Sequence, residues 1–180
     1  MSLGKKGLLA AIVLMTSFSS ASAHRLDEYL QATTIDLAQD LVTLRLRLTP
    51  GVDVAERVLK QIDQNGNGIL TPQEQHAYAL QVARGLTFSL NGKTLPLRLA
   101  VSTFPAIVEL KAGTGVISLQ FNVRTFLKKG SYHLAYLNRG SGPDTVWLVN
   151  CLVPHDPSLH ILGQKRLVDQ ASYALDFLID

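Results

Sequence analysis

One polar segment of this sequence, residues 63–74, places oxygen-bearing groups at alternate positions. Ca²⁺ is a hard cation that binds six to eight oxygen ligands, and a short loop supplies so many only if it folds back sharply. Gly68 stands at the sixth position, where the sharp turn requires a residue without a Cβ. The expected ligands are Asp63, Asn65, Asn67, Ile69 (through its backbone carbonyl), Thr71 and Glu74.

A surface turn is the competing interpretation of this segment, since both of its Asn-Gly pairs favour turns. A plain turn, however, does not require Asp, Asn, Asn, Gly and Glu at positions 1, 3, 5, 6 and 12, which is the spacing of a calcium loop. Only Asp63 and Glu74 are ionised ligands, and the sequence has no second such loop. We therefore expect weak binding, with a dissociation constant of about 10⁻⁴–10⁻³ M, which suits a structural clamp rather than a sensor.

The residues on both sides of the segment have helical patterns. Residues 53–62 repeat apolar side chains at helical spacing, with Asp53 as the expected N-cap. Thr71 and Glu74 form a capping box with Pro72 at the first helical position, and the second helix is expected to end near Gly85. Helix, twelve-residue loop and helix together predict an EF-hand inserted at residues 53–85.

The remainder of the chain alternates apolar and polar residues with the period of β-strands. Strands are expected at 29–38, 41–48, 86–90, 95–99, 116–123, 132–137, 145–153 and 170–179. Asn91-Gly92 predicts a hairpin, Pro96 marks an edge strand, and the apolar run 145–153 is typical of a central strand. We predict a mainly β fold, an antiparallel immunoglobulin-like β-sandwich that carries the EF-hand.

The first 23 residues have the features of a signal peptide. Lys5 and Lys6 precede a short apolar run, and cleavage is expected after Ala23, so that residues 24–180 form one domain in the periplasm or outside the cell. Removal of the two lysines lowers the formal charge from +3 to +1, which argues against a nucleic-acid partner. We expect no membrane span in the mature chain, and the single cysteine, Cys151, excludes an internal disulfide.

His24 would be the first residue of the mature chain. A free amine beside an imidazole suits Cu(II) or Ni(II), which favour nitrogen ligands. The alternative function is therefore a periplasmic accessory protein that handles copper, nickel or cobalt through His24. His76, His133, His155 and His160 do not lie at close ligand spacing, and we interpret them as ordinary surface or turn residues.

Two further groups of residues have the side-chain types of catalytic sites. Ser141, His133 and Asp144 are the residue types of a hydrolase triad, but the sequence has no G-x-S-x-G nucleophile elbow. Asp27 and Glu28 are adjacent, and adjacent side chains of an extended segment point apart. We therefore expect a binding or structural protein rather than an enzyme.

Four stretches of the chain carry a family resemblance: residues 23–33, 48–52, the 63–74 loop and 148–157. They resemble the extracytoplasmic N-terminal region of HupE/UreJ-type bacterial membrane proteins, which are relatives of nickel and cobalt permeases. The resemblance implies a periplasmic domain with a calcium loop, and a membrane protein of the cell envelope as its partner. No hydrophobic span follows Asp180 in this sequence, so we do not expect the chain itself to transport metal.

Overall fold

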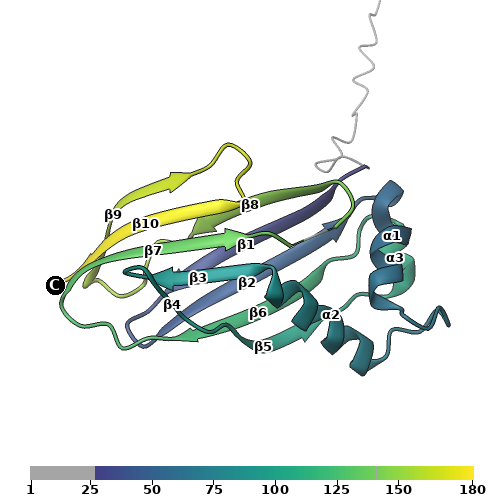
Figure 1. The fold of residues 1–180 in the computed structure, drawn as a ribbon, viewed down its shortest axis with the longest axis horizontal. Helices are drawn as coiled ribbons and strands as arrows, with labels where there is room; N and C mark the ends of the chain where they lie inside the picture. Colours follow the sequence, from purple (N-terminus) through teal and green to yellow (C-terminus); the bar gives the residue numbers. More distant parts are fainter. Residues whose placement is uncertain (1–26, 141) are drawn as a thin grey trace, which may run out of the picture.

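The computed structural model describes residues 27–140 and 142–180, which fold mainly into two antiparallel-dominated β-sheets stacked as two layers (Figure 1). Sheet A has the strand order β5 (Arg98–Thr103), β6 (Ile117–Arg124), β2 (Leu41–Pro50), β1 (Tyr29–Leu37), β8 (Thr145–Cys151). Sheet B has the order β4 (Lys93–Thr94), β3 (Leu86–Leu90), β7 (Gly130–Asn138), β10 (Ser172–Ile179), β9 (Leu159–Arg166). The expected signal peptide and His24 lie outside the described residues.

The strands alternate between core and solvent as their sequences predict. In β2 the side chains of Leu44, Leu46 and Leu48 are buried, whereas Arg45 and Arg47 between them are exposed. Alternate side chains of a strand point to opposite faces, so one face of each sheet enters the core. The same alternation buries the apolar face of β10, which consists of Tyr173, Leu175, Phe177 and Ile179.

Buried polar side chains join the two layers across the core. The hydroxyl groups of Thr33 in sheet A and Tyr136 in sheet B lie 2.9 Å apart. The side-chain amide of Asn138 donates to Oε1 of Gln31 over 3.0 Å. Buried polar groups without such partners would destabilise the fold, so these pairs fix how one sheet lies on the other.

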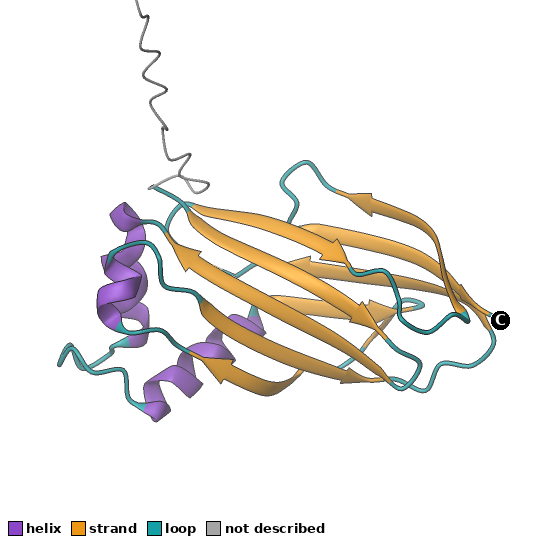
Figure 2. Cartoon of the chain, turned by 180° about the vertical axis from the view of Figure 1, so that it is seen from behind, coloured by secondary structure: helices purple, strands orange, loops and turns teal. Residues whose placement is uncertain are grey.

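Three helices gather at one end of the sandwich, and the C-terminus lies at the other end (Figures 1 and 2). Helices α1 (Val52–Ile62) and α2 (Pro72–Arg84) stand between β2 and β3, and α3 (Ile107–Lys111) stands between β5 and β6. None of the described helices is long and apolar enough to cross a membrane. The N-cap of α1 is Gly51, so the prediction of Asp53 was wrong by two residues, and Asp53 lies in the first turn instead.

The capping box of Thr71 and Glu74 with Pro72 at the start of α2 is confirmed, and Gly85 follows the helix as expected. Gly85 has the right-handed backbone angles φ −79° and ψ −9°, whereas a glycine that ends a helix commonly adopts left-handed angles. A Cβ added to Gly85 would lie only 2.7 Å from Cα of Gly140. Gly85 is therefore suited to close backbone packing between α2 and the segment after β7, rather than to a left-handed helix end.

Four features differ from the sequence-based expectation. Strand β8 was expected to be central, but it lies at the edge of sheet A and runs parallel to β1. Strand β9 and helix α3 were not predicted, because neither has a long apolar period. The strand expected at 95–99 is wrong in its bounds, because β4 ends at Thr94 and β5 begins at Arg98. Pro96 lies in the connection between them, where the chain crosses from one sheet to the other.

Candidate calcium site

The loop of residues 63–74 begins after the last turn of α1 and ends in the first turn of α2. Figure 2 shows that the connection between these two helices projects from the helical end of the sandwich. The apolar faces of both helices are buried, so the helices hold the two ends of the loop in fixed positions. Leu70 packs against the hydrophobic core and anchors the middle of the loop, as its apolar side chain predicts.

Three side chains of the loop turn back onto its own backbone. Asp63 accepts from the backbone N–H of Asn67 (3.2 Å, Oδ1) and of Gly68 (2.9 Å, Oδ2). The Oδ1 atom of Asn65 accepts from the N–H of Asn67, and Oδ1 of Asn67 accepts from the N–H of Ile69, each over 2.9 Å. These bonds curl the chain around its oxygen-bearing groups. Each amide oxygen keeps a second lone pair that remains available to a ligand.

Two glycines allow the loop to curl this tightly. Gly66 has φ +69° and Gly68 has φ +76°, both in the left-handed region that residues with a Cβ rarely adopt. Gly68 occupies the sixth position, where the sequence requires the sharp turn. A Cβ at either position would meet no neighbouring atom, so strain in the backbone rather than lack of space selects glycine here.

Glu74 closes the loop from its far end. Its Oε2 accepts from the backbone N–H (2.9 Å) and the hydroxyl (2.7 Å) of Thr71. Its Oε1 accepts from the backbone N–H of Gln64 over 3.2 Å, which brings the last expected ligand beside the first part of the loop. The hydrogen bonds from Thr71 lower the pKa of Glu74, so this carboxylate is ionised at neutral pH.

A hollow of about 280 Å³ separates the loop from the short helix α3. Asp63, Gly66 and Gly68 line it from the loop, and Lys60 and Lys111 line it from α1 and α3. The ammonium group of Lys111 pairs with Glu56 over 2.8 Å, which offsets part of its charge beside the loop. Because α3 was not predicted from the sequence, its contribution to this hollow was also missed.

The expected ligand set consists mainly of neutral oxygens. Between Asp27 and Asp180, omitting position 141, no three His, Cys, Asp or Glu side chains gather into a metal-binding group. The loop instead combines the Asp63 and Glu74 carboxylates with amide, hydroxyl and carbonyl oxygens. Such a set fits a hard cation such as Ca²⁺ and does not fit metals that favour nitrogen or sulfur ligands.

The other candidate residues from the sequence are not brought together. His133 pairs with Asp176 (2.7 Å) and His160 pairs with Asp180 (3.2 Å). Asp144 pairs with Arg57 rather than with His133. Ser141 lies outside the described residues, as does His24, so the structure does not bear on a transition-metal site at the mature N-terminus.

Compared with known proteins, the chain matches no protein-family model, no curated protein sequence and no solved structure. The resemblance to the N-terminal region of HupE/UreJ-type proteins therefore stays a prediction. The function of the chain is inferred below from its own residues and their geometry.

Proposed function

We propose that this chain is a calcium-binding domain whose 63–74 loop acts as an EF-hand on an immunoglobulin-like β-sandwich. The observation that carries the proposal is the closure of the loop by Glu74, whose carboxylate hydrogen bonds to Gln64 next to Asp63. This hydrogen bond holds the Glu74 carboxylate beside the residue that follows Asp63, at the start of the loop. The inward-turned amides of Asn65 and Asn67 lie between them in sequence, as a calcium loop requires.

Calcium would act as a clamp between two helices that are otherwise joined by a polar loop. The buried face of α1 consists of Val54, Ala55, Val58, Leu59 and Ile62, and that of α2 consists of Tyr78, Ala79 and Val82. Both faces rest on the sandwich core rather than on a second EF-hand. An ion held by residues from both ends of the loop would favour this packed arrangement over the unfolded chain, since only the folded chain binds it.

Polar contacts connect the helix pair to the sandwich. The hydroxyl of Tyr78 in α2 lies 2.6 Å from that of Tyr29 at the start of β1. Arg57 in α1 pairs with Asp144, and the carbonyl of Asp144 accepts from the backbone N–H of Tyr29 over 3.0 Å. A clamp on α1 and α2 would therefore also stabilise the start of β1 and the turn before β8, which lie at the same end of the molecule.

Weak affinity fits a compartment in which calcium is abundant. Two ionised ligands and the absence of a second calcium loop in the sequence favour a dissociation constant of about 10⁻⁴–10⁻³ M. Together with the expected signal peptide, this supports a periplasmic or secreted domain. Its proposed partner is a membrane protein of the cell envelope, to which the clamped domain would present a fixed surface.

The variant Glu74→Gln separates calcium binding from helix capping. Glutamine completes a capping box as glutamate does, but it has no negative charge and only one ligand oxygen. Isothermal titration of the calcium-free mature chain should show saturable binding for the wild type and at least a tenfold loss of affinity for Glu74→Gln. Thr71→Ala is a second variant, which removes the helix cap, a hydrogen bond to Glu74 and one expected neutral ligand; it should lower stability by about 1 kcal/mol and weaken calcium binding less than Glu74→Gln does. Equal calcium heats in wild type and Glu74→Gln would refute the proposal.

A further inference from the structure

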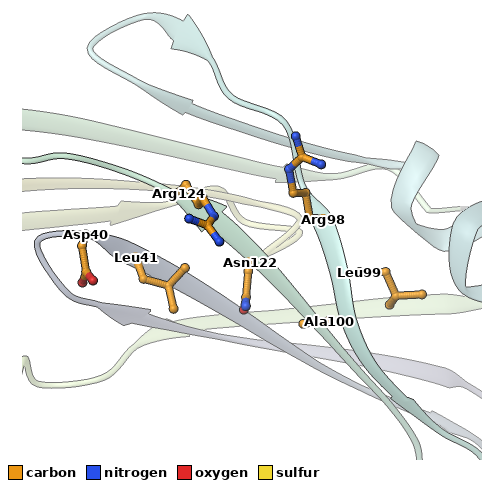
Figure 3. Close-up of a pocket in the computed structure, with 7 residues that line it drawn as sticks. All are labelled: Asp40, Leu41, Arg98, Leu99, Ala100, Asn122 and Arg124. Atoms are coloured by element: carbon orange, nitrogen blue, oxygen red, sulfur yellow. The ribbon is translucent and has the colours of Figure 1, made fainter.

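A second polar hollow, of about 350 Å³, lies on sheet A far from the loop. Its lining includes Arg98 at the start of β5 and Asn122 and Arg124 at the end of β6 (Figure 3). Phe121 and Val123 face the core, so Asn122 and Arg124 lie on the outer face of the sheet. The pairing of Arg124 with Leu41, the first residue of β2, places this hollow at the end opposite the helices.

The hydrogen-bond donors around this hollow lack acceptors. Neither Arg98 nor Arg124 makes an ion pair or a side-chain hydrogen bond with any other described residue. The amide oxygen of Asn122 accepts from Nε2 of Gln120 over 3.3 Å, which leaves its NH₂ group as a free donor. Two adjacent strands therefore carry three donor groups at one hollow, without an acceptor among the described residues. In Figure 3 the guanidinium of Arg98 points away from the amide of Asn122, so the long Arg98 side chain would turn toward Arg124 to share one ligand.

Arg98 and Arg124 carry like charges on neighbouring strands. Arg98 lies opposite Asn122, so Arg98 and Arg124 are diagonal neighbours, a distance that long side chains can span. Two such cations repel each other, and an anion between them would remove this repulsion. Guanidinium groups bind oxyanions through two parallel N–H donors, which makes arginine pairs well suited to this task.

We propose that Arg98, Asn122 and Arg124 form a binding site for the oxyanion of a phosphate or sulfate monoester. A phosphate ester presents three acceptor oxygens, one for each of the three donor groups, whereas a carboxylate presents two. Leu41, which pairs with Arg124 across the strands, also lines the hollow on this face and would contact the organic part of the ester.

One acidic side chain opposes the anion. Asp40 lines the same hollow and is the only carboxylate among the described residues of its wall. Its charge reduces the net positive charge of the site, so the affinity should be modest and salt-dependent. This predicts that Asp40→Asn tightens binding by about two- to fivefold, the effect of one exposed charge.

A matched control is available on the same sheet face. Arg47 is exposed on β2 and makes no ion pair within the described residues, but it does not line the hollow. Arg47→Gln removes the same charge from the protein as Arg124→Gln does. A specific site should lose affinity with Arg98→Gln or Arg124→Gln only, whereas general attraction of anions would weaken equally with all three changes.

The test is a titration followed by amide and side-chain NMR shifts in chelator-treated protein, with inorganic phosphate, phenyl phosphate, inorganic sulfate and acetate as ligands. Saturable shifts at Asn122 with phosphate and sulfate but not acetate, lost in Arg98→Gln and Arg124→Gln and kept in Arg47→Gln, are expected. Tighter binding of phenyl phosphate than of inorganic phosphate would identify an ester rather than the free ion as the ligand. Shifts that do not saturate, or that respond equally to all three arginine variants, would overturn the proposal. Since calcium is absent, the result is independent of the 63–74 loop.

Discussion

The contact between Tyr29 and Tyr78 shows how much the helical end depends on single polar groups. Both side chains are buried, and their hydroxyl groups lie 2.6 Å apart. Each hydroxyl satisfies the other inside the core, where an unpaired polar group is costly. Tyr78 lies within the second helix that the sequence predicts, but its hydroxyl partner could not be predicted, since Tyr29 is 49 residues away.

Replacing Tyr78 with phenylalanine should lower the free energy of unfolding by about 1–3 kcal/mol, because the hydroxyl of Tyr29 then loses its buried partner. The double variant Tyr29→Phe/Tyr78→Phe should regain part of this loss, since no buried hydroxyl is left unpaired. Urea unfolding of the wild type, the two single variants Tyr29→Phe and Tyr78→Phe, and the double variant measures both effects. If the double variant lost as much free energy of unfolding as the two single variants together, or more, the result would argue against this account.

The sequence predicted the ligand positions of the candidate calcium loop, but not the contacts that depend on its surroundings. The spacing of Asp63, Asn65, Asn67 and Glu74 was visible in the sequence because a loop ligates through local, ordered positions. The hydrogen bond from Gln64 to Glu74 and the lysines of the neighbouring hollow were not visible, since they depend on how α1, α2 and α3 pack.

At the scale of elements, strands with strict alternation were predicted well. The sequences of β2 and β6 have one mainly apolar and one mainly polar face, and the observed bounds of β1, β2, β6 and β10 agree closely with the prediction. Strand β8 misled the prediction because its apolar run is typical of a central strand, whereas Val146 and Leu148 remain 37% exposed at the sheet edge. Strand order also depends on contacts between distant residues, which periodicity does not contain.

The close approach of Gly85 and Gly140 gives an element-scale prediction. Gly85→Ala should lower the free energy of unfolding by about 1–3 kcal/mol, because the new methyl group would overlap the backbone of Gly140. The backbone angles of Gly85 are open to alanine, so the loss would measure crowding rather than strain.

Gly163→Ala is the matched control for this change. A Cβ at Gly163 would meet only Oδ2 of Asp176, at 4.0 Å, so its effect should stay within about 0.5 kcal/mol. Equal thermal stability of the Gly85 and Gly163 variants would contradict the predicted backbone contact.

At the scale of the whole molecule, alkaline pH should unfold the protein through its buried tyrosines. Burial raises the pKa of Tyr78 to about 12 and raises the pKa of Tyr29 well above 10. Above pH 10 the unfolded chain releases these protons while the folded chain keeps them, so stability falls as the pH rises. Urea unfolding between pH 9 and pH 11 should show a loss of about 1.4 kcal/mol per pH unit for each such tyrosine once the pH exceeds 10. Unchanged stability across this range would contradict the burial of both hydroxyl groups.

At the loop, acid rather than alkali should lower stability, because the pKa shift of Glu74 is opposite in sign to those of the tyrosines. The pKa of Glu74 is lowered in the folded chain, so its stabilising contribution is present above the ordinary pKa of 4.5 and is lost as the pH falls through the lowered value. Calcium binding requires the same carboxylate to be ionised, so it should weaken in this acidic range as well. Both effects place the working range of the loop at neutral pH.

The central claim, that the 63–74 loop clamps the helical end of the molecule with Ca²⁺, is tested most directly by melting the mature chain in chelator and in about 10 mM calcium. With a dissociation constant of about 10⁻⁴–10⁻³ M, the ion should add about 1.4–2.7 kcal/mol and raise the melting temperature by roughly 3–10 °C. The variant Asp63→Ala should show no such rise. Identical melting temperatures of the wild type in chelator and in calcium would contradict the account.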